Sequence, residues 1–233
     1  GGVMIGDAPA GTSSLSFDGD PVPVDEDGKF IIAFNRDAGQ AAHLVATLDN
    51  GQTVRKFINI APRKWQIEHV SLNRSGRTAS ESFKRRRAPE LAQINAARSV
   101  KSDSAGWRQD FIWPVKGRIS GMFGNQRIYN GGIDIAAANG TYYVAPADGV
   151  VTLAASSPFT LEGNLLMIDH GMGLNSAFLH SSEILVEAGE VVKRGQPIGR
   201  IGSTGSATGP HLHWSMKWNQ ARIDPILLTG AMD

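Results

Sequence analysis

Cysteine is absent from all 233 residues of the chain. A chain without thiols cannot form disulfide bonds or use a cysteine nucleophile, so any metal site must be built from His, Asp or Glu side chains. Long apolar runs are missing as well, since no stretch approaches the roughly 18 residues that a membrane-spanning helix needs. The formal net charge is only +1, so we expect no nucleic-acid partner on electrostatic grounds.

Several catalytic motifs are also missing. No Gly-x-Ser-x-Gly sequence occurs, which excludes the nucleophile elbow of the α/β-hydrolases. No His-Glu-x-x-His sequence occurs, which excludes a thermolysin-like zinc site. The glycine-rich segment 202–209 lacks the lysine of a phosphate-binding loop, so we do not expect nucleotide chemistry from it.

The residues that are present have an ordinary globular composition, 41% hydrophobic and 19% charged, suited to one large or two modest domains. Residues 1–72 favour β structure, because short apolar runs occupy 30–34, 44–48, 54–60 and 65–70. Asp27-Gly28 and Asn50-Gly51 separate these runs, and such pairs favour tight hairpin turns. We predict a small β-sandwich that serves as an accessory domain.

Residues 73–110 are distinguished by their charge. The run Lys84-Arg85-Arg86-Arg87 is basic, and Pro89 could open a short helix over 90–100 because proline suits a first helical turn. We predict a basic linker with a short helix. The basic run is interpreted as a solvated face, and contact with an anionic polymer such as the cell wall is the alternative.

Residues 111–233 return to β patterns and contain many glycines. Buried strands are predicted at 149–153, 165–168, 176–179, 190–192 and 197–201, and no long amphipathic helix is expected. With the N-terminal part, these runs predict a mainly β chain.

Histidines cluster in this C-terminal part, four of the six lying between 170 and 213. His211 and His213 are two apart, so on a strand they project from one face while Leu212 points to the core. One imidazole could then bind a metal while the other contacts metal-bound water or a substrate oxygen. Two surface histidines on an edge strand are the alternative.

Two further residues are candidates for the same site. Asp134 stands alone in an apolar segment, where a buried carboxylate needs a cation or hydrogen bonds. A metal would serve, and capping of a nearby turn is the alternative. His180 ends an apolar run and could reach a site on the sheet face, or be purely structural. His170 precedes a glycine turn and is interpreted as structural.

The order of these segments resembles the lysostaphin-type zinc endopeptidases of the bacterial cell wall, over about residues 113–228. The similarity rests on Gly132-Ile133-Asp134-Ile135-Ala136 and on Gly209-Pro210-His211-Leu212-His213, together with 113–120, 123–124, 145–151, 168–171, 178–180, 195–199 and 202–205. The resemblance implies a compact, mostly antiparallel β fold with a groove, so residues 111–233 would form the zinc endopeptidase domain. Segment 202–209 would then shape one wall of that groove.

The resemblance also implies a Zn²⁺ cofactor and a role for each candidate residue. Asp134 and His213 match two of the family's zinc ligands, and His180 and His211 match the histidines that flank its catalytic water. Three protein ligands and a water are typical of catalytic zinc. The ion lowers the pKa of that water to about 7, and the flanking histidines would orient the water and stabilise the oxyanion.

One zinc ligand of the family is missing. The family's first histidine lies four residues before the aspartate, and this position is Asn130 here. An amide oxygen is a poor zinc ligand beside imidazole. Residues lost from the sequence between Tyr129 and Gly132, a degenerate domain and an engineered change are three explanations. We favour the first because the other site residues are all present.

The implied substrate is peptidoglycan, with cleavage of stem peptides or their cross-links. The alternative is a degenerate, metal-free module that binds or regulates cell-wall hydrolases. Both interpretations place the protein in the periplasm or among secreted, cell-envelope proteins. The N-terminal domain could also contact the groove within the same molecule.

Overall fold

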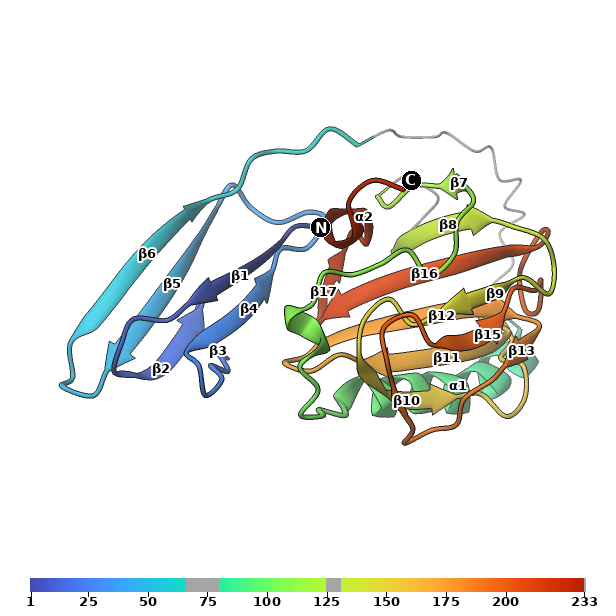
Figure 1. The fold of residues 1–233 in the computed structure, drawn as a ribbon, viewed down its shortest axis with the longest axis horizontal. Coiled ribbons are helices and arrows are strands. Elements are labelled where there is room, and N and C mark those ends of the chain that lie inside the picture. Colours follow the sequence, from blue (N-terminus) through green and yellow to red (C-terminus); the bar gives the residue numbers. More distant parts are fainter. Residues whose placement is uncertain (66–79, 125–130, 233) are drawn as a thin grey trace.

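The computed structural model describes residues 1–65, 80–124 and 131–232, and its elements are mainly strands, as predicted (Figure 1). Asn130, Tyr129 and His69 lie outside these ranges. The hypothesis that residues are lost between Tyr129 and Gly132 therefore falls on a segment that the structure does not describe. Among the described residues, no helix is both long and apolar enough to cross a membrane.

The N-terminal part consists of two small antiparallel sheets. One pairs β1 (Val3–Asp7) with β4 (Lys29–Ala33). The other has the order β3-β2-β5-β6, formed by β3 (Asp20–Val22), β2 (Thr12–Phe17), β5 (Ala41–Leu48) and β6 (Thr53–Asn59). Buried Leu15, Ile32 and Leu44 come from both sheets and share one core. This arrangement agrees with the small sandwich that the sequence predicts.

The predicted turns of this part have different outcomes. Asn50-Gly51 joins β5 to β6, and Gly51 has a φ of 81° that glycine adopts without strain. Asp27-Gly28 lies between β3 and β4, but β3 pairs with β2 and β4 pairs with β1. The prediction of a hairpin at Asp27-Gly28 is therefore wrong. Of the run predicted at 65–70, Trp65 is not in a strand and the rest lies outside the described residues.

The helix of the predicted linker is longer than expected. α1 runs over Glu81–Ser99, so Pro89 lies inside it and the predicted opening at Pro89 is wrong. The helix begins after Ser80, whose hydroxyl accepts a hydrogen bond from the Phe83 N–H at 3.2 Å. An interior proline costs about 3 kcal/mol. Burial of Ile94 and Ala97 against the large sheet offsets this cost, so α1 is a layer of the fold.

The C-terminal part is built on one large antiparallel sheet. Its order is β14-β10-β11-β12-β16-β8-β7, with β17 paired to β16. The strands are β7 (Arg118–Gly121), β8 (Gly132–Ala136), β10 (Gly149–Ala154), β11 (Asn164–Asp169), β12 (Leu174–Ser181), β14 (Val191–Val192), β16 (His211–Trp218) and β17 (Ala221–Ile223). The strands predicted at 149–153, 165–168, 176–179 and 190–192 therefore lie in this sheet, and the sheet places β16 between β12 and β8.

The two faces of the large sheet are covered by different layers. On one face, Leu212 and Trp214 of β16 are fully buried in a core shared with Tyr143 and Ile198. Those two come from a small sheet of β13 (Glu183–Ile184), β15 (Pro197–Arg200) and β9 (Tyr142–Val144). The other face packs partly on α1, which Figure 1 shows running along the sheet beside β10 and β11.

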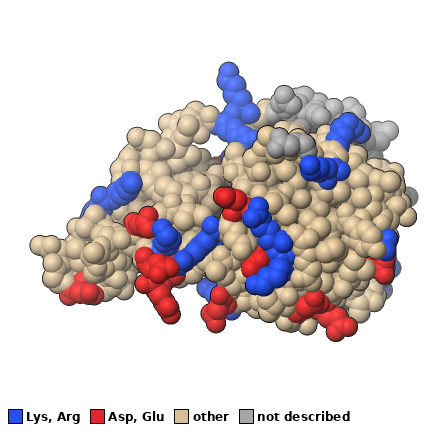
Figure 2. All heavy atoms as spheres, viewed as in Figure 1, with Lys and Arg blue, Asp and Glu red and all other residues tan. Residues whose placement is uncertain are grey.

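The N-terminal part packs on the Trp218 end of β16. Phe17 meets Trp218 edge to face, with ring centroids 6.2 Å apart. Arg63 pairs with the fully buried Asp224 at 2.6 Å, just before α2 (Ile226–Thr229). Arg108, in the 3₁₀ turn Gly106–Arg108, pairs with Asp25 and Asp27. Figure 2 shows basic and acidic side chains side by side at this junction.

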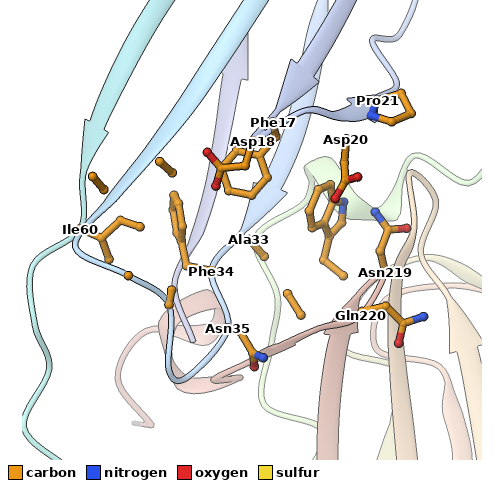
Figure 3. Close-up of a pocket in the computed structure, with 16 residues that line it drawn as sticks. Phe17, Asp18, Asp20, Pro21, Ala33, Phe34, Asn35, Ile60, Asn219 and Gln220 are labelled. Carbon is orange, nitrogen blue, oxygen red and sulfur yellow. The ribbon is translucent and has the colours of Figure 1, made fainter.

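A cavity of about 380 Å³ remains at the junction (Figure 3). Phe17 and Phe34 line it from the N-terminal part, and Asn219 and Gln220 line it from the β16–β17 turn. The contacts of this junction lie at the end of β16 opposite to His211. The predicted contact between the N-terminal domain and the groove therefore stays a prediction.

Candidate functional site

The His-x-His pattern lies on a strand, as predicted. Exposure alternates along β16, and Leu212 is fully buried between half-buried His211 and His213. β8 pairs with β16 in a register that places Asp134 opposite His213. Opposite residues of an antiparallel pair leave the same face of the sheet, so the carboxylate and the two imidazoles converge.

Glycine permits this close approach of the two strands. A Cβ on Gly132 would lie 2.3 Å from the carbonyl oxygen of Trp214 on β16. No side chain fits at that distance, so Gly132 is required where β8 enters the sheet next to Asp134.

Asp134 is the centre of the polar contacts. The Nδ1 of His213 lies 2.6 Å from its Oδ1, and the Nε2 of His211 lies 3.8 Å from the same oxygen. Burial favours a higher pKa for Asp134, but the His213 hydrogen bond and the three nearby imidazoles hold that pKa below its usual value. The carboxylate is therefore charged at neutral pH and favours a positive charge beside it.

His180 joins the site from the end of β12. Its ring centroid lies 4.9 Å from that of His211 and 6.4 Å from that of His213. The backbone of His180 has a φ of 68°, a conformation that non-glycine residues adopt rarely and that often marks functional positions. Burial lowers the pKa of His180, and the neighbouring histidines lower it further, so its imidazole is neutral near pH 7.

Backbone carbonyls fix the tautomers of two histidines. The Nδ1 of His180 lies 2.8 Å from the carbonyl oxygen of Thr204, and the Nδ1 of His211 lies 2.8 Å from that of Gly209. A carbonyl oxygen only accepts, so in its neutral form either ring carries its proton on Nδ1 and leaves Nε2 as an acceptor. Both acceptors belong to the cluster around Asp134.

The structure thus brings together all four predicted site residues, namely Asp134, His180, His211 and His213. Sequence reasoning missed the carbonyls of Thr204 and Gly209, which orient two of them. The signal for these carbonyls is the glycine-rich segment 202–209 directly before His211.

The remaining histidines of the described residues lie away from this cluster. His170 is fully buried, with Nδ1 2.8 Å from the Asp148 carbonyl oxygen and Nε2 2.8 Å from the Ser176 hydroxyl, as its structural interpretation requires. His43 lies on β5 beside Phe57 and Asp18 in the N-terminal part.

Asp134 and His213 fit a zinc ion as two of its ligands, because a carboxylate oxygen and an imidazole nitrogen are ligands that zinc accepts. Ligands of tetrahedral zinc lie about 3.3 Å apart, so these two atoms would separate slightly from their present 2.6 Å. The described residues contain no group of three or more possible metal ligands. A complete set therefore needs a ligand from outside the described ranges.

Comparison with known proteins finds similarity over this region. The sequence profile of Peptidase family M23 matches residues 128–225. The peptidoglycan DD-endopeptidase ShyA of Vibrio cholerae is 40% identical over 114 residues, which cover 45% of this chain and 26% of ShyA. The murein hydrolase activator NlpD of Escherichia coli is 35% identical over 120 residues, which cover 52% of this chain and 30% of NlpD.

Similarity at the level of structure extends over nearly the whole chain. A crystal structure of a candidate M23 peptidase from Pseudomonas aeruginosa matches with a TM-score of 0.78 and 28% identity. The match covers 99% of this chain and 94% of the other. The chain spans only about a quarter to a third of the length of the curated relatives that it matches.

Proposed function

Because this chain belongs to peptidase family M23, we propose that it is a zinc-dependent endopeptidase that hydrolyses peptide bonds in bacterial peptidoglycan, in stem peptides or their cross-links. The observation that carries the proposal is the convergence of Asp134, His180, His211 and His213 from three strands. The hydrogen bond between Asp134 and His213 joins residues 79 positions apart. Burying such a cluster of polar side chains on one sheet face disfavours folding, so the cluster is better explained by a catalytic role.

Asp134 and His213 would hold the zinc ion in this proposal. When bound, zinc supplies a water of lowered pKa and polarises the scissile carbonyl. His180 is neutral at pH 7 and keeps Nε2 free to accept, so it would take a proton from the attacking water. In its neutral form His211 has the same tautomer, so its Nε2 would accept a hydrogen bond from the water and hold it in place.

Backbone hydrogen bonds at His180 support a preorganised site. The His180 N–H donates to the Glu162 carbonyl at 2.9 Å, and the Thr204 N–H donates to the His180 carbonyl at 3.3 Å. His180 is therefore held by loop contacts before a substrate arrives, which lowers the entropy to be lost in the transition state.

Digestion of purified muropeptides by the protein, with and without a chelator, tests the proposal. We expect new peptide termini that disappear with chelator and return with added zinc. The variant Asp134→Ala should release no product under the same conditions. Products that persist under chelation would falsify the assignment as a zinc enzyme.

A metal-free binding module is the second candidate function. Asn130 at the family's histidine position favours it, and so does the 2.6 Å hydrogen bond that satisfies Asp134 and His213 without an ion. The relative NlpD, named a murein hydrolase activator, is a precedent for a regulatory role. Zinc content of the purified protein distinguishes the candidates, with about one ion per chain expected for the enzyme and none for the module.

Either function places the protein at the cell envelope, periplasmic or secreted, where peptidoglycan is found. We further propose that residues 1–72 act as an accessory domain and 73–110 as the linker to the peptidase domain 111–233. The contacts of Phe17 and Arg63 with the C-terminal part, and the pairing of Arg108 with Asp25 and Asp27, support a fixed position for this accessory domain.

A further inference from the structure

The cavity at the junction combines aromatic side chains with small apolar ones. Phe17, Phe34 and Trp218 line it, and Ala33 and Ala42 leave room in it because each carries only a methyl group. Its volume is about 380 Å³. Binding sites for small molecules typically measure about 300–1,000 Å³ and occur preferentially where two domains meet. The size and the place of this cavity are therefore those of a ligand site.

Two hairpin turns bring polar side chains to the cavity from the two parts of the chain. Asp18 and Gly19 join β2 to β3 with φ angles of 50° and 93°, and Asp20 is the first residue of β3. Asn219 and Gln220 join β16 to β17, and Asn219 has a φ of 49°. Figure 3 shows these side chains together with the aromatic ones. Tight turns between paired strands hold their backbone in place, so a ligand meets a preorganised set of groups.

These polar side chains keep most of their hydrogen-bonding capacity. All four are exposed, and among the described residues Asp20, Asn219 and Gln220 have no side-chain hydrogen bond or ion pair. One oxygen of Asp18 accepts a hydrogen bond from the His43 N–H at 2.7 Å, which leaves its second oxygen available. The cavity therefore offers carboxylate oxygens that only accept, and amide groups that both donate and accept.

This combination discriminates between classes of ligand. Asp18 and Asp20 repel anions, and a wholly apolar ligand would remove water from the polar groups without replacing its hydrogen bonds. A sugar ring suits both parts of the cavity. Its C–H groups form an apolar face that packs on an aromatic ring, and its hydroxyl groups donate to carboxylates and exchange hydrogen bonds with amides. An N-acetyl group adds a methyl and an amide, which match the alanines and the amide side chains.

We propose that the cavity binds an N-acetylated sugar unit of a glycan strand, packed on Phe17 and Phe34 and hydrogen-bonded by Asp20 and Gln220. The choice of glycan rests on the proposed function, because peptidoglycan is the polymer that supplies it. Trp218 and His211 are seven positions apart on β16, which is about 24 Å at about 3.4 Å per residue. The cavity anchors the glycan strand at that distance from the peptide bond that is cut.

An NMR titration of the full chain in chelator tests this site without using hydrolysis. The probe is the peptide-free tetrasaccharide of N-acetylglucosamine, and its addition should shift the backbone amide signals of Asn219 and Gln220. Asp20→Ala should weaken binding about tenfold, because a hydrogen bond to a charged group is lost. Gln220→Ala should weaken it about fivefold, because the lost hydrogen bond is a neutral one.

Matched controls separate the cavity from the general properties of the surface. Asp49→Ala and Gln52→Ala remove the same two groups from exposed positions outside the cavity, and their affinity should equal that of wild type. All four variants change exposed side chains, so we expect them to melt as wild type does. The site is overturned if the tetrasaccharide leaves the wild-type signals in place. Equal affinity of Asp20→Ala, Gln220→Ala and wild type, or equal losses in the controls, would overturn it as well.

A second titration, with 1,5-diaminopentane, distinguishes sugar recognition from attraction of cations by Asp18 and Asp20. We expect smaller shifts with the diamine than with the tetrasaccharide, and we expect them to disappear at high salt because exposed charges are screened. Shifts of Asn219 and Gln220 with the diamine alone would identify a cation site and overturn the glycan site.

Failure of the glycan site and failure of the proposed function are distinguishable. A protein that binds the tetrasaccharide through Asp20, yet releases no product from muropeptides with zinc, supports the glycan site and refutes the peptidase. A protein that cuts muropeptides with zinc, yet does not bind the tetrasaccharide, refutes the glycan site and keeps the peptidase.

Discussion

Arg87 joins α1 to the loop that supports His180, and its replacement is the most informative test of the fold. Its guanidinium donates to both oxygens of Glu162, at 2.6 and 2.5 Å, and to Glu90 at 2.9 Å. The three side chains are only 13–16% exposed. Burial disfavours the charged form of Arg87, but these hydrogen bonds outweigh it and raise the Arg87 pKa.

Arg87→Met leaves the Glu162 carboxylate buried without its cation. Glu90 keeps the Thr160 N–H and hydroxyl as donors, at 2.7 and 2.6 Å, so most of the loss falls on Glu162. Breaking a buried pair from one side costs about 3–5 kcal/mol, and the partial exposure favours the lower end, about 3 kcal/mol. For a chain of this length the melting temperature should fall by roughly 6 °C.

Urea unfolding followed by circular dichroism measures this change. Arg86→Met, one residue away and exposed, is the matched control and should change stability by less than about 0.5 kcal/mol. The double variant Arg87→Met with Glu162→Leu should recover much of the loss, because the unpaired Glu162 carboxylate is removed and Glu90 keeps its Thr160 donors. Equal stability of Arg87→Met and Arg86→Met would refute the assignment of a structural ion pair.

Three further predictions concern titration and the site. His213→Ala should remove bound zinc as measured by metal analysis, whereas His211→Ala should keep the zinc and slow turnover by about 10²-fold, as expected for loss of a group that positions the attacking water. Burial lowers the pKa of His170 to about 4, so the unfolded chain binds one more proton than the folded chain between about pH 6.5 and 4. The free energy of unfolding should therefore fall by about 3 kcal/mol as the pH is lowered through that range. His170→Gln should flatten this part of the plot of unfolding free energy against pH. Burial, and then the nearby Arg98 and Arg222, lower the pKa of Lys217 to about 8, so above about pH 8 the unfolded chain binds the extra proton and the free energy of unfolding should rise with pH, a rise that Lys217→Met should remove.

The elements that could be predicted are those specified by local patterns. Alternation around Leu212 predicts a strand with two histidines on one face, and Asn50-Gly51 predicts a hairpin because few other residues adopt its backbone angles. Apolar runs predict the central strands of the large sheet, because both faces of those strands are covered. The four candidate residues of the site belong to such patterns.

The remaining features depend on contacts between distant parts of the sequence. The start of α1 is fixed by Ser80 and by packing on the sheet, which outweigh the local tendency of Pro89 to open a helix. The pairing of Arg87 with Glu162 spans 75 positions and leaves no local signature. The junction at Trp218 likewise depends on strand order, which the apolar pattern does not reveal.

The central position of β16 has a consequence for folding. β16 is made late on the ribosome, yet it joins β12 to β8, a strand made about 80 residues earlier. Because so many of its contacts are non-local, the C-terminal part should fold slowly, on the millisecond-to-second timescale of high-contact-order β proteins. A chain that ends before residue 211 leaves β8 and β12 with unpaired edges that favour aggregation. Nascent chains would therefore carry no assembled histidine cluster until synthesis is nearly complete, which delays any hydrolytic activity until the last long strand has paired.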